Sequence, residues 1–177
     1  GSIHAENYET LNMRINNMGR FYQEDIDRAY LGQERKTSQI IHDIVAQSAF
    51  SRGVMIFASS VDLGGRRIIK KKTELSRMIG GNINMSKTER KKFVTDFRNM
   101  KFKYAVSVGT LNVGVDFPHV DVIALLRPTE SVALLRQIIL RGARLFKDKL
   151  FFLILDYCQA IERHFPDFDV FNPEIKA

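Results

Sequence analysis

The chain reads Val-Ile-Ala-Leu-Leu at residues 122–126 and Leu-Phe-Phe-Leu-Ile-Leu at residues 150–155. Both runs are short and wholly apolar, which is typical of strands that are buried on both faces. Between them the sequence predicts a helix over about residues 130–145. A strand, a helix and a second strand in this order favour a parallel sheet, because parallel neighbours need a long crossover connection.

Two further strands and a capped helix are predicted upstream. Residues 54–58 and residues 104–108 are apolar runs of strand length. Ser86 and Glu89 fit a capping box, in which each side chain accepts a hydrogen bond from the other residue's backbone N–H. The apolar face of the helix that follows is predicted to contain Phe93, Phe97 and Met100.

This alternation predicts an α/β domain whose parallel sheet is covered by helices on both faces. In such sheets ligands bind beyond the carboxyl ends of the strands. We therefore expect ligand contacts among residues 59–62, among residues 109–118 and in the segment after Leu126.

The N-terminal part of the chain differs in character from the rest. Residues 1–2, Gly-Ser, resemble a cloning scar, which is consistent with an excised fragment. Residues 3–50 are polar and are predicted to form a helical connector packed on a domain of residues 51–177. An acidic turn at residues 23–27 is expected to open one helix and Thr37 a second. The second helix has an apolar stripe formed by Ile40, Ile41, Ile44, Val45 and Ser48.

The composition of the 177 residues excludes several classes of protein. The single cysteine, Cys158, cannot form an internal disulfide, and the four histidines show no metal-ligand spacing, so no metal site is predicted. His119 and His164 are expected to be hydrogen-bonded structural residues. No apolar stretch approaches the roughly 20 residues that cross a bilayer, and the N-terminus lacks a signal segment. We expect a cytoplasmic protein without a membrane partner.

The formal net charge of +7 is concentrated in one part of the chain. Residues 51–103 carry 14 basic and 4 acidic side chains, whereas the segments on either side are slightly acidic. The densest run is at residues 66–72, and residues 90–92 follow it. A local excess of this kind can mark a phosphate-binding face or can be a solvated helix face.

The chain lacks the pattern of a phosphate-binding loop, Gly-x-x-x-x-Gly-Lys-Ser/Thr. Its two glycine pairs, at residues 64–65 and 80–81, are not followed by Lys and a hydroxyl residue. An acidic box of the type Asp-Glu-x-His is missing as well. We therefore expect no ATP hydrolysis by this chain alone.

Two arginines in the predicted helix of residues 130–145 are the strongest candidates for chemistry. Arg141 and Arg144 are three residues apart, and Gln137 lies one turn before them. Guanidinium groups commonly stabilise the charge on a phosphoryl group during its transfer. The alternative is that both arginines are ordinary surface residues of the helix.

These arginines close an ordered series of motifs. Residues 114–121 read Gly-Val-Asp-Phe-Pro-His-Val-Asp, and residues 124–131 read Ala-Leu-Leu-Arg-Pro-Thr-Glu-Ser. Residues 137–144 follow, and Leu-Asp-Tyr stands at residues 155–157. The series resembles the second RecA-like domain of superfamily 2 helicases, most closely the RadD-like (YejH-like) group, and the resemblance covers roughly residues 19–175.

The resemblance implies a RecA-like sheet and a place in an ATP-dependent DNA helicase or translocase. A preceding RecA-like domain would carry the phosphate loop, and ATP and Mg²⁺ would bind in the cleft between the two domains. Arg141 and Arg144 match the arginines of motif VI, which implies a catalytic role at the β/γ-phosphates. Gly114 and Asp116 match motif V, which implies nucleotide contacts or, for Asp116, a link to motif VI. Gln137 matches the first residue of motif VI, which implies a nucleotide contact that couples nucleotide and nucleic acid. The alternative for Gly114 and Asp116 is a buried turn at a strand end.

The resemblance also implies a nucleic-acid surface. Ser59 and Ser60 lie at the end of the motif IV strand, and Ser107, Gly109 and Thr110 lie in the first half of motif V. Hydroxyls and backbone amides at these places would contact strand phosphates. The implied partner is single-stranded or branched DNA, with RNA as the alternative.

Three departures from the family pattern leave other functions open. Leu140 stands where glycine is usual, Asn112 and Val113 replace small hydroxyl residues, and Leu135 and Arg136 replace an aromatic residue and a glutamine. A diverged domain that only binds nucleic acid or protein is therefore one alternative. A nucleotide-binding domain complete in itself is another.

Overall fold

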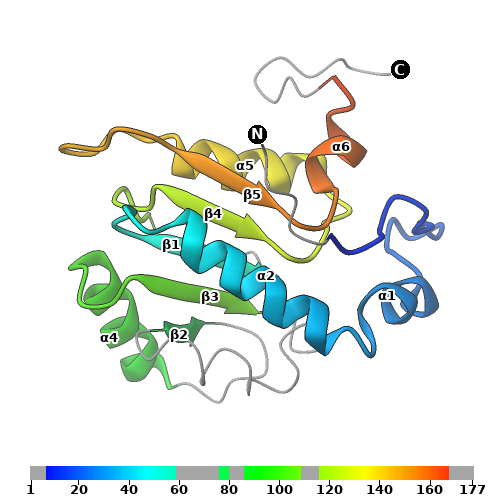
Figure 1. Cartoon of the computed structure of the whole chain (residues 1–177), viewed down its shortest axis with the longest axis horizontal. Helices are drawn as coiled ribbons and strands as arrows, with labels where there is room; N and C mark the ends of the chain where they lie inside the picture. Colours follow the sequence, from blue (N-terminus) through cyan, green and yellow to red (C-terminus); the bar gives the residue numbers. More distant parts are fainter. Residues whose placement is uncertain (1–6, 59–75, 80–85, 109–115, 168–177) are drawn as a thin grey trace.

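The computed structural model describes residues 7–58, 76–79, 86–108 and 116–167 of the chain. These residues form a five-stranded sheet in which every neighbouring pair of strands is parallel (Figure 1). The strand order is β2-β3-β1-β4-β5. The strands are β1 (Val54–Ala58), β2 (Ser76–Ile79), β3 (Tyr104–Val108), β4 (Val122–Leu125) and β5 (Leu153–Asp156).

The strands of the sheet begin at one level. Val54 in β1 is paired with Tyr104 in β3 and with Val122 in β4. Tyr104 is paired in turn with Ser76 in β2, and Val122 with Leu153 in β5. The strands therefore start at the same edge of the sheet, which we name the amino edge, and end at the opposite, carboxyl edge.

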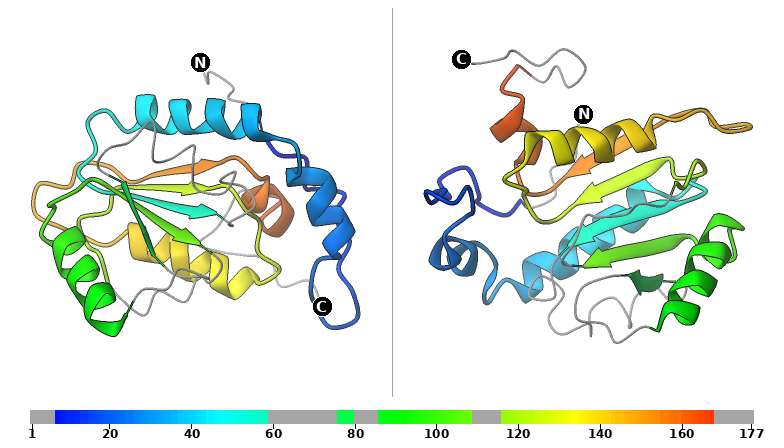
Figure 2. Two further views of the ribbon diagram at one scale, coloured as in Figure 1. Left: turned by 90° about the horizontal axis from the view of Figure 1, so that it is seen from below. Right: turned by 180° about the vertical axis from the view of Figure 1, so that it is seen from behind.

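Helices cover both faces of the sheet, as predicted. Figure 2 (left) shows α2 (Glu34–Gln47) on one side and α4 (Lys87–Arg98) and α5 (Val132–Gly142) on the other. Alternate residues of β1 point to the two faces, so Val54 and Ile56 join the core under α2 while Met55 and Phe57 join the core under α4 and α5. The chain thus has the predicted α/β architecture.

All four predicted strands are present, and β4 and β5 have corrected limits. β4 ends one residue earlier than expected, and β5 begins at Leu153 rather than at residue 150. The late start of β5 has a physical reason, since Leu150 is 92% exposed and lies outside the core. β2 was not predicted, because this edge strand contains Ser76 and Arg77 and lacks an uninterrupted apolar run.

The capping box of α4 is confirmed, but the end of the helix is not where the sequence predicts it. Ser86 Oγ accepts from Glu89 N at 3.1 Å, and Glu89 Oε2 accepts from Ser86 N at 2.9 Å. The prediction that Met100 belongs to this helix is wrong, because α4 ends at Arg98; Met100 has a positive φ of 56° and is exposed.

α5 and α2 also differ from their predicted ranges. α5 spans only Val132–Gly142, because Ser131 caps its start by accepting from Leu134 N at 3.1 Å. α2 begins at Glu34, one turn before the expected start at Thr37.

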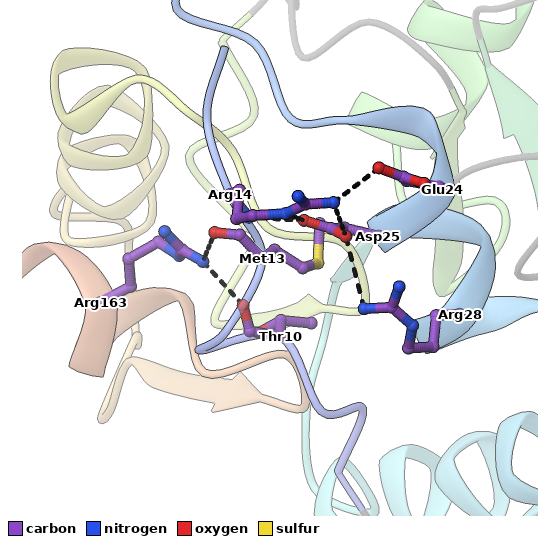
Figure 3. A network of polar contacts seen from close by, with 7 residues as sticks. All are labelled: Thr10, Met13, Arg14, Glu24, Asp25, Arg28 and Arg163. Carbon is purple, nitrogen blue, oxygen red and sulfur yellow. Dashed lines mark hydrogen bonds and ion pairs between the residues drawn. The ribbon is translucent and has the colours of Figure 1, made fainter.

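The N-terminal segment is joined to the far end of the chain. Tyr8 N donates to Tyr157 O at 2.8 Å, just after β5, and Arg163 in α6 (Ala160–His164) donates to Thr10 O at 2.7 Å and to Met13 O at 2.8 Å (Figure 3). These contacts tie the segment before α1 (Gln23–Tyr30) to the end of the sheet.

An ion-pair cluster fixes the entry to α1. Arg14 donates to Asp25 from its backbone N at 2.7 Å, from Nε at 3.0 Å and from Nη2 at 3.0 Å (Figure 3). These hydrogen bonds from Arg14 lower the pKa of Asp25 to about 2.

α2 shares its core with the sheet, since Ile40, Ile41 and Ile44 are in one cluster with Val54 and Ile56. The domain boundary at residue 51 stays a prediction. Among the described residues, no helix has the length and apolar character needed to cross a membrane.

We predict that α2 unfolds together with the sheet. Ile44 is fully buried, so Ile44→Ala is expected to lower the free energy of unfolding by about 2–5 kcal/mol. Its neighbour Val45 is 38% exposed, so Val45→Ala is expected to change that energy by no more than about 0.5 kcal/mol. Urea denaturation of the chain measures both. Equal losses in the two variants, or no loss in Ile44→Ala, would contradict the shared core.

Candidate functional site

Asp116 of the predicted motif V and Arg144 of the predicted motif VI meet at the amino edge of the sheet. Asp116 precedes β4 by six positions, and Arg144 follows the last turn of α5. α5 runs back from the carboxyl end of β4, so its own C-terminal end lies near the start of β5 (Figure 1). Arg144 Nη1 donates to Asp116 Oδ2 at 2.6 Å. The site is therefore at the edge opposite to the one expected from the carboxyl-end rule.

The ion pair is open to solvent on one side. The side chains of Asp116 and Arg144 are 43% and 56% exposed, so the pair contributes only about 0–1 kcal/mol to stability. The second oxygen, Asp116 Oδ1, is buried and has no hydrogen-bond partner in the described part of the chain. Arg98, at the end of α4, donates from Nη2 to Asp116 O at 3.4 Å. The pair thus determines where the Arg144 guanidinium lies more than it stabilises the fold.

Arg141 lies three residues before Arg144, on the last turn of α5. It is half-buried and lines a hollow together with Phe117, Ile138 and Gly142. Gln137 lies exposed on the same helix, one turn earlier. The structure therefore places the two arginines and Asp116 in one region of the amino edge, with Gln137 farther along α5.

Leu140 does not obstruct this region. It is helical and 43% exposed, so its bulk is accommodated toward solvent where the family pattern has glycine. Gly142 is the glycine that the packing requires, because a Cβ there would lie 1.9 Å from Phe152 Cε2 and 2.9 Å from Ile123 Cδ1.

Sequence reasoning missed Lys149, which lies beside the ion pair. Its Nζ donates to Gly142 O, to Arg144 O at 2.9 Å and to Pro118 O at 3.4 Å. Burial lowers the pKa of Lys149, and the carboxylates of Asp121 and Asp116 oppose this shift. Its partners are backbone carbonyls, which every residue type carries, so no pattern of residue types could reveal them.

Asp121 organises the beginning of β1 and β4 at the same edge. Its buried carboxylate accepts from Ser51 Oγ at 2.6 Å and from Arg52 N at 3.1 Å. Its backbone N donates to Gly53 O at 3.1 Å, and its backbone O accepts from Leu153 N at 2.8 Å. One residue thereby connects the starts of β1, β4 and β5.

The two histidines behave differently. His164 is hydrogen-bonded as predicted, through Nε2 to Thr129 O. For His119 the prediction is wrong: the residue is 1% exposed, and neither ring nitrogen has a hydrogen-bond partner among the described residues. Burial lowers the pKa of His119 to about 4, with Lys149 and Arg98 adding to the shift and Asp121 opposing it. His119 is therefore neutral at physiological pH and packs edge-on against Phe97 at a centroid distance of 4.7 Å.

The predicted nucleic-acid contacts are only partly described. Ser107 lies near the carboxyl end of β3 and is 3% exposed, which does not favour direct contact with a strand phosphate. The other predicted nucleic-acid contacts lie outside the described residues: Ser59, Ser60, Gly109 and Thr110. The densest basic run, residues 66–72, and the predicted nucleotide contact Gly114 lie outside them as well.

Comparison with known families identifies the domain. The family model for the helicase conserved C-terminal domain matches residues 36–146, which include β1, β4, α5 and both arginines. The chain belongs to the helicase C-terminal domain family. The matched range begins inside the segment predicted to be a connector.

One curated relative is similar over half of the chain. The protein irc3 of Schizosaccharomyces pombe, which bears the name of a mitochondrial ATP-dependent helicase, is 41% identical over 88 residues. The match covers 50% of this chain and only 14% of the relative. The superfamily 2 assignment is confirmed, whereas the RadD-like group and the cytoplasmic location stay predictions.

Solved helicase structures share the fold. The helicase Lhr of Mycobacterium smegmatis, bound to single-stranded DNA and AMP-PNP, matches with a TM-score of 0.58 at 19% identity, over 80% of this chain and 20% of Lhr. Dbp5 of Saccharomyces cerevisiae, bound to RNA and ADP BeF3, matches with a TM-score of 0.52 at 16% identity, over 70% and 32% of the two chains. At these identities the likeness shows the RecA-like fold alone.

We predict that Gly142→Ala destabilises the end of α5. The added Cβ would collide with the Phe152 ring and with Ile123, so a loss of about 1–3 kcal/mol is expected from overpacking. Leu140→Ala, two residues away on the solvent side, is the matched control and is expected to stay within about 0.5 kcal/mol. Thermal unfolding of the two variants measures the difference. A Gly142→Ala variant as stable as the control would contradict the close packing on Phe152.

Proposed function

We propose that this chain is the second RecA-like domain of an ATP-dependent superfamily 2 DNA helicase or translocase of the RadD-like group. In this proposal Arg141 and Arg144 act on ATP that is bound mainly by an N-terminal RecA-like domain of the same protein. The carrying observation is the Asp116–Arg144 ion pair at the amino edge, with Arg141 beside it.

The electrostatics of the amino edge suit a polyphosphate. Four cationic side chains, those of Arg98, Arg141, Arg144 and Lys149, lie near residues 116–118. Guanidinium groups present paired N–H donors that match phosphate oxygens, and they stay charged at any physiological pH. The residues present therefore fit a phosphate group that approaches from outside the domain.

Each site residue then has a role that its position allows. Asp116 holds the Arg144 guanidinium at the amino edge, and Arg141 lies on the last turn of α5, three residues before Arg144. We assign Gly114 and Gln137 to the nucleotide side of the site from their places in motifs V and VI. When bound, ATP with Mg²⁺ supplies the phosphoryl group that is transferred to water, and the phosphate loop for it belongs to the N-terminal domain.

Exposed apolar side chains at the same edge support a covering partner domain. Phe50, shortly before β1, is 94% exposed, and Leu145 and Leu150, which flank the turn before β5, are 97% and 92% exposed. Exposed apolar side chains mark an interaction surface where they form one contiguous patch. An N-terminal domain seated on the amino edge would cover them together with the ion pair.

The nucleic-acid side of the proposal rests on different residues. α4 presents Arg90, Lys91 and Lys92 to solvent, and the predicted phosphate contacts follow the carboxyl ends of β1 and β3. Lhr bound to single-stranded DNA and Dbp5 bound to RNA support a nucleic-acid partner, and we propose DNA with RNA as the alternative. The nucleic acid and ATP would thus meet opposite edges of the sheet.

A second candidate, a module that only binds nucleic acid or protein, rests on Leu140. The exposure of that side chain weakens this candidate, because Leu140 points to solvent and leaves the Asp116–Arg144 pair intact.

We predict that the arginines are required for ATP turnover by the full-length protein. DNA-stimulated ATPase is measured for wild type, Arg141→Ala and Arg144→Ala, with the native upstream domain present. Loss of an arginine that stabilises transition-state charge is expected to lower kcat on the order of 10³-fold.

Arg35→Ala is the matched control, because Arg35 is exposed at the start of α2, which covers the opposite face of the sheet from α5. Its kcat is expected to equal that of wild type. Equal rates in wild type and both site variants would contradict the arginine assignment. A wild type that binds DNA but hydrolyses no ATP would favour the binding module.

A further inference from the structure

Lys149 joins the two segments that carry Asp116 and Arg144. Of its three acceptors, Gly142 O ends α5, Arg144 O lies two residues beyond it, and Pro118 O belongs to the segment that leads from Asp116 to β4. An ammonium group has three N–H donors, so these three carbonyls use its full capacity.

The electrostatics favour a cation at this place. The last carbonyls of a helix have no partner within the helix and carry a partial negative charge. Lys149 is partly withdrawn from water, which by itself lowers its pKa, and Asp121 and Asp116 favour its charged form. The ammonium therefore replaces lost hydration with three carbonyls and two nearby carboxylates.

The loop before Lys149 is held so that its side chain reaches these carbonyls. Asp148 has a positive φ of 60°, which is uncommon for a residue other than glycine. Arg52, just before β1, donates from Nη1 to Lys147 O at 2.6 Å and from Nη2 to Asp148 O at 3.2 Å. Lys149 N closes the turn by donating to Phe146 O at 3.0 Å. Arg52 thus holds the turn that carries Lys149, and this contact does not involve the Asp116–Arg144 ion pair.

We propose that Lys149 is a positioning residue for the arginine pair. It locks the end of α5 to residues 116–118, and this lock keeps Arg144 within hydrogen-bond distance of Asp116 and holds the last turn of α5, with Arg141, at the amino edge. The inference rests on the proposed function. Lys149 acts through the arginines and needs no contact with ATP.

The kinetic experiment uses the full-length protein with its upstream domain. Lys149→Met is expected to lower kcat of the DNA-stimulated ATPase by about 10–100-fold, since small misplacements of a catalytic group cost that much. KM for ATP is expected to change less than about threefold, because the upstream domain binds most of the nucleotide. Lys149→Arg, which keeps a cation with several donors, is expected to recover part of the rate.

A double-mutant cycle separates positioning from stability. If Lys149 acts through the arginines, adding Lys149→Met to a variant that already carries both Arg141→Ala and Arg144→Ala is expected to cost little further kcat, whereas independent effects would multiply. Lys147→Met is the matched control, because Lys147 is exposed in the same turn and is expected to keep the wild-type rate. Lys149→Gln replaces Lys149→Met if the latter does not fold.

Hydrogen exchange on this chain provides a readout that does not depend on ATP. The amides of Ala143 and Arg144, which bond to Ile139 O and Arg141 O, are expected to exchange faster in Lys149→Met, while those of β1 keep their rates. Unchanged exchange at both amides overturns the inference. Equal kcat in Lys149→Met and in an active wild type also overturns it. Effects that multiply in the mutant cycle overturn it as well. A wild type without ATPase activity overturns the proposed function and the catalytic part of the inference, and the exchange result then tells whether the lock exists.

Discussion

The fold depends on one constraint of parallel sheets: each strand must start at the edge where its neighbour starts. The register of β4 and β5 places Val122 opposite Leu153, so the chain that leaves β4 must travel back across the sheet before β5 begins. α5 makes this return (Figure 1). Its last turn therefore comes back to the amino edge, where Asp116 lies just ahead of β4, and residues 28 positions apart form an ion pair.

In the proposed function, the same constraint separates the nucleic-acid contacts from the nucleotide contacts. The strand ends after Ala58 and Val108 lead into the predicted nucleic-acid contacts, whereas α5 delivers both arginines to the opposite edge. Arg98, one of the basic residues between positions 51 and 103, lies beside Asp116 at the amino edge, whereas Arg90, Lys91 and Lys92 lie in the first half of α4. Composition alone indicates a phosphate partner, and the proposed function assigns nucleic acid to the basic segment and ATP to the arginine pair.

The fold is predictable from the sequence where burial is uniform. The central strands are apolar on both faces, so their type is clear, whereas the edge strand β2 contains Ser76 and Arg77 and carries no such signal. Met100 keeps the helical spacing of Phe93 and Phe97, but α4 ends at Arg98 and the chain turns through a positive φ. Periodicity reports which side chains are apolar and does not report where the backbone changes direction. For the site, the ordered motifs single out Asp116 and both arginines, whereas the carboxyl-end rule is wrong for Asp116, which lies ahead of β4 at the amino edge. Lys149 escapes prediction because it binds backbone carbonyls, and His119 because a buried neutral ring can be held by packing against Phe97.

The central claim is that the amino edge of this domain faces ATP held by a partner domain. The most direct measurement is a crystal structure of the full-length protein with a non-hydrolysable ATP analogue and Mg²⁺. We expect guanidinium nitrogens of Arg141 and Arg144 within about 3 Å of phosphate oxygens, with Phe50, Leu145 and Leu150 covered by the N-terminal domain. An analogue bound in that protein with the amino edge turned toward solvent, and both arginines remote from the phosphates, would contradict the claim.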